Sequence, residues 1–221
     1  MVTYVPLLDE ENMKNVAELF AKELSGKVNL FVFHDTDPAK CQFCDQTIEL
    51  AKEISSLDSR IALTLYNINK NPKEAKFLGV DKVPAIVIGG KKIYNMRYFG
   101  IPAGYEFSSL LEDIVDASTG NTRLSDKTKV ALKSISKPVD IKVFVTPTCP
   151  YCPGSVRLAH QFAMENSMIT GSMIEAQEFM EMSQKYSVMG VPRIVINDSI
   201  HLDGAQHEEA MLENVLRAAK E

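Results

Sequence analysis

The sequence predicts an α/β fold built from two copies of one unit, each with a central mixed β-sheet flanked by helices. Three observations lead to this prediction. Two Cys-x-x-Cys motifs, Cys41 to Cys44 and Cys149 to Cys152, use all 4 cysteines of the 221-residue chain. A proline preceded by valine, Pro84 or Pro192, follows the first cysteine of each motif at a distance of 43 residues. The motifs lie 108 residues apart, and apolar residues keep their type at that offset, which indicates a duplicated unit.

The repeat predicts two domains. We expect an N-terminal domain at residues 1–119 and a C-terminal domain at residues 120–221, each of about 100 residues and large enough to bury its own core. A polar linker is expected near Ser118 to Thr122. The apolar fraction of 45% and the charged fraction of 24% are ordinary for a globular protein. No apolar run reaches the ~18 residues that suggest a membrane span.

Composition also limits the cellular compartment and the classes of partner that we expect. The stretch Met1 to Leu8 is apolar but has neither a basic leader nor the length of a secretion signal, so we expect a cytoplasmic protein. In a reducing cytoplasm, closely spaced cysteines are more often catalytic or metal-binding than structural. The net charge is −5 and no dense Lys/Arg patch is present, so we expect neither nucleic acid nor a membrane as partner.

Each half is expected to open with a capped helix. Asp9 can cap a helix whose apolar residues recur at helical spacing from Met13 to Leu24. Ser125 can cap the counterpart in the second half. That second helix is expected to carry Val130, Leu132 and Ile135, and to end before Pro138.

The strands and helices that follow are also predicted in pairs. A strand leads into each motif, at Val28 to Phe33 and at Ile141 to Val145, and an amphipathic helix follows the motif. A second strand is expected at Ile61 to Tyr66 and at Met168 to Ile174, and then a short helix, which Pro72 can start in the first half. Each half should close with an apolar strand, a turn, a further strand and a helix; the turn signals are Gly89-Gly90 and Asn197-Asp198.

The cysteine pairs suit thiol–disulfide exchange. At a strand-to-helix junction the first cysteine meets unpaired amides and the helix dipole, which favour a thiolate. Such surroundings lower a thiol pKa from about 8.5 to roughly 3.5–7.5, and the thiolate is the attacking species. Cys41 and Cys149 are therefore the expected nucleophiles. Cys44 and Cys152, expected one turn inside the helix, would resolve the mixed disulfide.

The charges around the two motifs differ. Lys40 favours a thiolate at Cys41, whereas Asp37 and Asp45 oppose it. No charged residue adjoins the second motif. Our hypothesis is that Cys149 is the more reactive thiol toward small reagents at neutral pH.

The two prolines predict a substrate-binding element. Pro84 and Pro192 precede apolar strands, where proline removes a ladder donor and is unusual. A cis peptide bond would explain both residues. In that geometry the backbone of Val83 or Val191 could offer an edge to an extended substrate segment, as in β-augmentation.

These motifs resemble a known family. A Cys-x-x-Cys at a strand-to-helix junction with a later Val-Pro looks like the thioredoxin fold, and Cys-Pro-Tyr-Cys at 149–152 is the glutaredoxin form of its active site. Two such units in one chain resemble the glutaredoxin-like protein disulfide oxidoreductases of archaea and thermophilic bacteria. The resemblance implies exchange on protein substrates without a bound cofactor or metal, and reduction by a thioredoxin-reductase-like flavoenzyme. It also implies that the four cysteines are redox pairs and that Pro84 and Pro192 are cis.

Several alternatives stay open at this stage. The chain could be an electron-transfer adaptor that passes electrons from a flavoprotein reductase to a peroxidase of the peroxiredoxin type. The cysteines could instead hold structural zinc or an iron–sulfur cluster between subunits. Glu175 and Asn67, at equivalent strand ends, are either a proton-moving site or ordinary polar residues. The methionine-rich stretch is either core filling or an adaptable protein-binding face; it includes Met164, Met173, Met180 and Met189.

Overall fold

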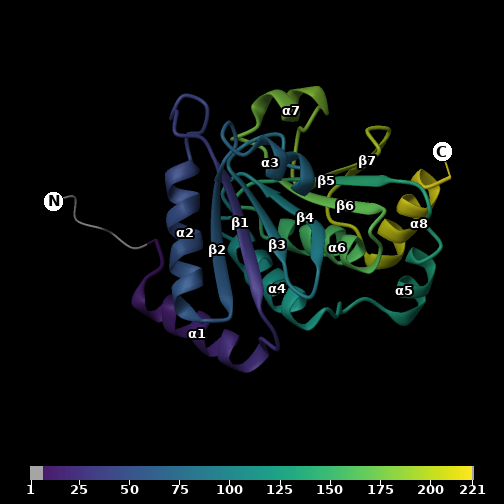
Figure 1. Cartoon of the computed structure of the whole chain (residues 1–221). Helices are drawn as coiled ribbons and strands as arrows, with labels where there is room; N and C mark the ends of the chain where they lie inside the picture. Colours follow the sequence, from purple (N-terminus) through teal and green to yellow (C-terminus); the bar gives the residue numbers. More distant parts are fainter. Residues whose placement is uncertain (1–6, 221) are drawn as a thin grey trace.

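A single eight-stranded mixed β-sheet runs through both halves of the chain in the computed structural model, which describes residues 7–220 (Figure 1). Its strand order is β2-β1-β3-β4-β6-β5-β7-β8. The strands are β1 Val28–His34, β2 Ile61–Asn67, β3 Ala85–Gly89, β4 Ile93–Phe99, β5 Val139–Val145, β6 Ile169–Glu175, β7 Arg193–Ile196 and β8 Ile200–Asp203. The helices are α1 Glu10–Glu23, α2 Cys44–Leu57, α3 Pro72–Leu78, α4 Glu106–Thr119, α5 Asp126–Leu132, α6 Cys152–Glu165, α7 Met180–Lys185 and α8 Glu208–Ala218.

The predicted repeat is confirmed by the order of the elements. Each half runs helix, strand, helix, strand, helix, strand, strand, helix. In the first half β1 pairs in parallel with β2 and antiparallel with β3, and β5 makes the same two kinds of pair with β6 and β7. The α/β fold class, with a mixed sheet flanked by helices, is therefore as expected.

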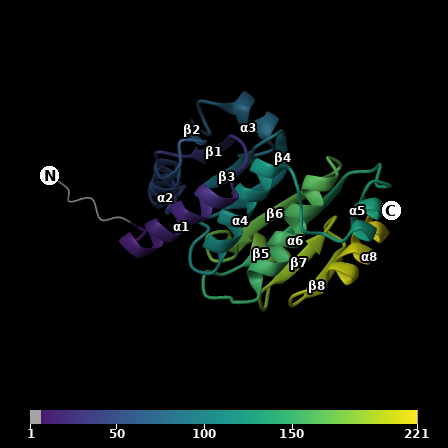
Figure 2. The same cartoon turned by 90° about the horizontal axis from the view of Figure 1, so that it is seen from below.

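The junction of the two halves was not predicted. Strands β4 and β6 pair in parallel, from Met96 opposite Gly171 to Phe99 opposite Ile174, and this pairing joins the two half-sheets (Figure 2). The expected boundary between residues 119 and 120 stays a prediction, because the sheet is continuous across the halves.

Two helices begin at the capping residues that the sequence predicts. Asp9 Oδ1 accepts a hydrogen bond from the Asn12 amide at 2.7 Å, and the Ser125 side chain accepts one from the Thr128 amide at 3.3 Å. Both bonds satisfy amides that the helix itself leaves unpaired.

The end of α5 differs from the prediction. The helix ends at Leu132, so Ile135 is buried beyond it rather than within it. The Asn166 side-chain amide donates to the carbonyl oxygens of Leu132 and Ile135, at 2.8 and 2.9 Å. These bonds satisfy the carbonyl groups that a further helical turn would have used.

The expected linker is also shorter than predicted. Ser118 and Thr119 belong to α4, which ends at Gly120 in the left-handed conformation, φ 72°. Ser118 is fully buried, and its Oγ accepts a hydrogen bond from the Ser25 amide at 3.2 Å. Its polarity therefore reflects a buried partner and not exposure to solvent.

The two faces of the sheet carry different layers. Helices α1, α2, α4, α5, α6 and α8 share one large apolar core with one face of the sheet, whereas α3 and α7 pack on the other face around Phe33, Phe99 and Phe144. The second face is thus covered by two helices of only 7 and 6 residues. Part of the stretch Met1 to Leu8, expected not to be a secretion signal, lies outside the described residues. Among residues 7–220 no helix is long and apolar enough to cross a membrane.

Candidate active site

Both Cys-x-x-Cys motifs lie at the same edge of the sheet. Strands β1 and β5 point the same way, since two antiparallel steps and two parallel steps separate them in the strand order. Each strand leads into its motif, so the two motifs share the edge formed by the carboxyl ends of these strands. Both pairs are disulfides, Cys41–Cys44 and Cys149–Cys152.

All four cysteines are buried, so the expectation of an exposed first cysteine is wrong, although the first of each pair is slightly more exposed than the second. Cys41 and Cys149 are 6% and 7% exposed, whereas Cys44 and Cys152 are 2% and 0% exposed. The expectation that the second cysteine lies one turn inside the helix is wrong. α2 begins at Cys44 and α6 at Cys152, because the residues between the cysteines form a turn that precedes the helix.

The two Val-Pro bonds are cis, as the sequence predicted. The Pro84 and Pro192 carbonyls accept hydrogen bonds from the amides of Gly100 and Gly204, both at 2.9 Å. Within residues 7–220, the backbone amide and carbonyl groups of Val83 and Val191 make no hydrogen bond. Both valines are half-buried. Free backbone groups of this kind are what the predicted pairing with an extended substrate segment requires, and that role stays a prediction.

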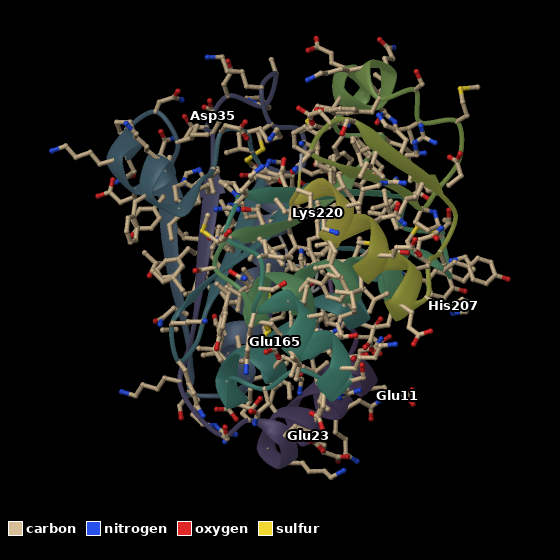
Figure 3. All side chains as sticks on the ribbon, turned by 90° about the vertical axis from the view of Figure 1, so that its right-hand side faces the viewer. Glu11, Glu23, Asp35, Glu165, His207 and Lys220 are labelled. Atoms are coloured by element: carbon tan, nitrogen blue, oxygen red, sulfur yellow. A yellow bond between two sulfur atoms is a disulfide. The ribbon has the colours of Figure 1, made fainter. Side chains whose placement is uncertain are left out.

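The first site is closed on one side by the segment before Cys41. The Asp35 amide donates to Cys44 Sγ at 3.3 Å, and Asp35 Oδ2 accepts from the Asn69 side chain at 2.8 Å. The Asp37 amide and Asn69 hold the pKa of Asp35 below its usual value, so its carboxylate is ionised at neutral pH. Figure 3 shows Asp35 at the end of the molecule opposite Glu23 of α1.

The second site is bordered by the first half of the chain. The Tyr105 amide donates to the Pro147 carbonyl at 3.0 Å, so the start of α4 lies against the segment that leads into Cys149. Gly104, at φ 60°, makes this approach feasible, because a Cβ there would lie 2.2 Å from the Pro147 oxygen. Glu106, the first residue of α4, is 1% exposed.

Glu106 was missed in the sequence. Its Oε2 accepts from Ser109 Oγ at 2.9 Å, whereas its Oε1 is buried without a partner, as is Ser155 Oγ on α6. Burial raises the pKa of Glu106 to about 7. The signal that could have found it is an acid in the first turn of a helix on its apolar face, four residues before Leu110.

Glu175 is buried at the carboxyl end of β6, between the two sites in the strand order, while its counterpart Asn67 is half-buried. Its Oε2 accepts from the Glu178 amide at 2.6 Å, and its Oε1 has no partner. Burial raises the pKa of Glu175, and burial together with the Glu175 charge raises that of Glu178 to about 7. The proton-moving role of Glu175 stays a hypothesis.

A buried polar network ties α6 of the second half to α4 of the first. Arg157 pairs with Asp113 and Asp116, and His160 Nδ1 lies 2.6 Å from Asp113 Oδ2. Tyr98 hydroxyl also donates to Asp113. Burial and the Arg157 charge lower the pKa of His160 to about 3, so its imidazole is neutral. The network explains this histidine as a packed residue.

Over residues 7–220 no group of three or more His, Cys, Asp or Glu side chains is arranged to hold a metal ion.

The fold and the site can now be compared with known proteins. A family model described as a thioredoxin domain matches residues 139–217. The structure of a protein disulfide oxidoreductase from Aeropyrum pernix superimposes with a TM-score of 0.91 at 33% sequence identity, covering 98% of this chain and 96% of that one. This chain belongs to the protein disulfide oxidoreductase family. The expected thioredoxin fold and the expected enzyme class, at the level of family, are thus confirmed.

Other relatives are larger proteins. The F component of alkyl hydroperoxide reductase from Staphylococcus aureus (strain N315) is 28% identical over 149 residues, which are 67% of this chain and 27% of that protein. A Bacillus subtilis protein named NADH dehydrogenase is 24% identical over 165 residues, 75% of this chain and 30% of that protein. The chain therefore spans about three-tenths of the length of these curated relatives. A structure of the F component of Enterococcus faecalis alkylhydroperoxide reductase, at 24% identity and a TM-score of 0.86, covers 94% of this chain and 99% of that one and shares the fold.

Proposed function

We propose that this protein catalyses thiol–disulfide exchange on protein substrates through both Cys-x-x-Cys sites. One observation carries the proposal. Each disulfide lies at the same edge of the sheet, in a half that also holds a cis Val-Pro bond whose valine has free backbone polar groups. Membership of the family supports the same chemistry.

The reaction starts from the dithiol form. The thiolate of Cys41 or Cys149 attacks one sulfur of a substrate disulfide, so that a mixed disulfide forms and the second substrate sulfur leaves as a thiolate. Cys44 or Cys152 then loses its proton and attacks the sulfur of its partner cysteine. The substrate leaves with two thiols, and the enzyme retains the two-electron oxidised pair. Run in reverse, the same steps oxidise a substrate dithiol.

Substrate binding is assigned to Val83 with Pro84 and to Val191 with Pro192. An extended substrate segment would pair with the free amide and carbonyl of the valine, as a strand added at an edge. The proline has no amide of its own to compete for this pairing, and its carbonyl is already engaged by a glycine amide.

The specific partners are also proposals. A reducing cycle needs an electron donor, for which we propose a thioredoxin-reductase-like flavoenzyme in the cytoplasm. The chain's likeness to part of the alkyl hydroperoxide reductase F component supports a redox partner of this general kind.

Reduction of insulin tests the main proposal. With excess dithiothreitol, the wild-type protein is expected to accelerate insulin precipitation, and the variant with all four cysteines changed to serine is expected to match the uncatalysed rate. Equal rates for the two proteins would contradict the proposal. Thermal unfolding of the four-serine variant, compared with that of reduced wild type, controls for a loss of fold.

A second function is favoured by the same relatives. The chain would act as an electron-transfer adaptor, in which one site receives electrons and the other delivers them to a thiol peroxidase. Paired variants separate the two functions. Independent sites predict partial activity in both Cys41→Ser/Cys44→Ser and Cys149→Ser/Cys152→Ser, whereas a relay predicts almost complete loss in either.

A further inference from the structure

The sheet face that carries α3 and α7 contains an open cavity of about 640 Å³. The two short helices leave the central strands β4, β6 and β5 partly uncovered, and the cavity lies over these strands. Its walls come from both halves of the chain: the end of α3 and the segment through Lys82 on one side, and Met182 of α7 on the other. In the described part of the chain, no redox cysteine is among its lining residues.

Three polar residues form a row across the floor of this cavity. Arg97 of β4 lies opposite Ser172 of β6, and Ser172 lies opposite Lys142 of β5. Neighbouring strands are about 4.8 Å apart, so the Cα atoms of Arg97 and Lys142 are roughly 10 Å apart with a hydroxyl between them. All three residues line the cavity. The β4–β6 pairing that joins the halves creates this row, and neither half contains it alone.

The hydrogen-bond donors of these three residues are only partly engaged by other protein groups. Arg97 Nε donates to the Leu78 carbonyl at 2.9 Å, and its two terminal nitrogens have no partner within residues 7–220. Burial lowers the pKa of Arg97, and the nearby Asp140 and Asp81 charges offset part of this shift. Ser172 is 4% exposed, and its hydroxyl, which is open to the cavity, makes no hydrogen bond in the described part of the chain. Lys142 Nζ bonds to Asp140 and Asp198 and has a third N–H to spare.

The rest of the lining fixes the class of ligand. Four basic residues line the cavity against two acidic ones, Asp81 and Asp140, which pair with Lys82 and Lys142 and leave Arg97 and Lys76 without an ion pair in the described part of the chain. Toward the helices the walls become apolar, with Ile68, Phe99, Ile174 and Met182. An arginine fork with a neighbouring hydroxyl and ammonium matches the oxygens of a phosphoryl group. The apolar wall suits a ring or a short hydrocarbon attached to it.

We propose that this cavity binds a small phosphorylated molecule, with its phosphoryl group on Arg97, Ser172 and Lys142 and its apolar body against Phe99 and Ile174. The bound phosphate accepts hydrogen bonds from the free guanidinium nitrogens and from the Ser172 hydroxyl at once. The site is separate from the disulfides, so the proposal does not depend on the redox function.

Calorimetric titration tests the site, with phenyl phosphate and inorganic phosphate as probes at low ionic strength. Wild type is expected to bind both, and phenyl phosphate at least tenfold more tightly because its ring contacts the apolar wall. Arg97→Gln is expected to weaken phenyl phosphate binding at least tenfold, and Arg97→Lys less, since the charge remains without the fork. The exposed Arg217→Gln on α8 is the matched control and should bind as wild type.

Ser172→Ala provides a second variant in case Arg97→Gln perturbs α3, whose last carbonyl it contacts. This change removes only the hydroxyl and should weaken binding a few-fold with an unchanged melting temperature. Insulin reduction should remain at the wild-type rate in all these variants. Wild type that fails to bind either probe, or variants of Arg97 and Ser172 that bind as tightly as wild type, would overturn the proposal.

Discussion

The two Cys-x-x-Cys sites share a scaffold but not their surroundings. At the first site, the longer segment before Cys41 contacts the pair through the Asp35 amide, which donates to Cys44 Sγ. At the second site the preceding segment is shorter, and α4 of the first half lies against it instead. These contacts come from the same half at the first site and from the other half at the second site.

The residues that precede the two cis Val-Pro bonds also differ between the halves. Asp81 and Lys82 precede the first cis Val-Pro, whereas Met189 and Gly190 precede the second. Met189 is 95% exposed, and Tyr151, inside the second motif, is 71% exposed. The two halves thus share the position of the disulfide and differ in the exposed residues around it. We expect the second site to favour apolar substrate segments and the first to favour charged ones.

The methionines of the methionine-rich stretch divide into a buried group and an exposed group, and a protein-binding role for the exposed ones stays a hypothesis. Met164 and Met173 are buried in the large core. Met180 and Met189 are exposed, at 64% and 95%, and with Val188 they line a shallow pocket beside the second cis Val-Pro. Flexible thioether side chains suit contacts with varied apolar surfaces.

The largest predicted effect is on the free energy of unfolding, and it tests whether the two halves unfold independently. Arg157→Met leaves Asp113 and Asp116 buried without their cation, which is expected to cost about 3–5 kcal/mol of unfolding free energy. Because these ion pairs join α6 to α4, the loss of Arg157 should destabilise both halves. We expect them to unfold in one transition, at a lower urea concentration than in wild type. Arg217→Met, at an exposed position on α8, is the control. A loss below about 1 kcal/mol, or unfolding of the second half alone, would contradict the shared interface.

The next effect concerns Glu106, the buried acid at the start of α4, just after the residues that contact Pro147. The pKa of Glu106 is about 7 in the folded protein, above the 4.5 of an unburied glutamate, so folding favours its protonated form. Its contribution to stability is fully present below pH 4.5 and is lost as the pH rises through 7. At pH 8 we expect Glu106→Gln to be more stable than wild type by about 3 kcal/mol, and the two to converge near pH 4.

Thermal unfolding from pH 4 to pH 8 measures this difference. Glu209→Gln on α8, at an exposed position, should follow wild type throughout. An unchanged difference between Glu106→Gln and wild type across this range would show that the carboxyl group is not held protonated by burial.

Local chemistry explains why much of the fold could be predicted from the sequence. The caps at Asp9 and Ser125 and the turn at Asn197-Asp198, both residues with positive φ, depend on near neighbours. The cis bonds before Pro84 and Pro192 were predictable because proline is unusual where a strand begins to pair.

The rest depends on contacts between distant parts of the chain. The β4–β6 pairing joins residues about 75 positions apart, and no local pattern specifies it. Polar residues on α4 and α6 look like a solvated helix face in the sequence. Only the packing of the two halves shows that Asp113, Arg157 and His160 are buried together. The contact between the start of α4, which carries Glu106, and the segment before Cys149 has the same origin.

A smaller effect compares the two nucleophiles directly. In the Cys44→Ser/Cys152→Ser protein, we expect iodoacetamide to modify Cys149 about tenfold faster than Cys41, a difference of roughly 1.4 kcal/mol. Asp37 and Asp45 oppose a thiolate at Cys41, and no charged residue adjoins the second motif. Peptide mass mapping over time gives both rates in one sample. Modification of Cys41 first would reject the hypothesis.

The smallest predicted effect comes from exchanging the residues at the equivalent positions 81 and 189. Met189→Asp copies Asp81 of the first half and, in a Cys41→Ser/Cys44→Ser background, should slow reduction of an apolar disulfide peptide by about three- to tenfold. Its melting temperature should not change, because the side chain is 95% exposed. The reciprocal Asp81→Met, in a Cys149→Ser/Cys152→Ser background, should speed the same reaction at the first site. Equal rates before and after both changes would show that these residues do not select substrates.

The central claim is that the two pairs are separate redox centres of one enzyme. Equilibration of the wild-type protein in a series of glutathione buffers, followed by alkylation and mass mapping of both motifs, tests it most directly. We predict two reversible two-electron transitions, one for Cys41–Cys44 and one for Cys149–Cys152, each reached within the cycle time of insulin reduction. A pair that stays fully oxidised or fully reduced across the whole series, or that exchanges more slowly than turnover, would contradict the claim.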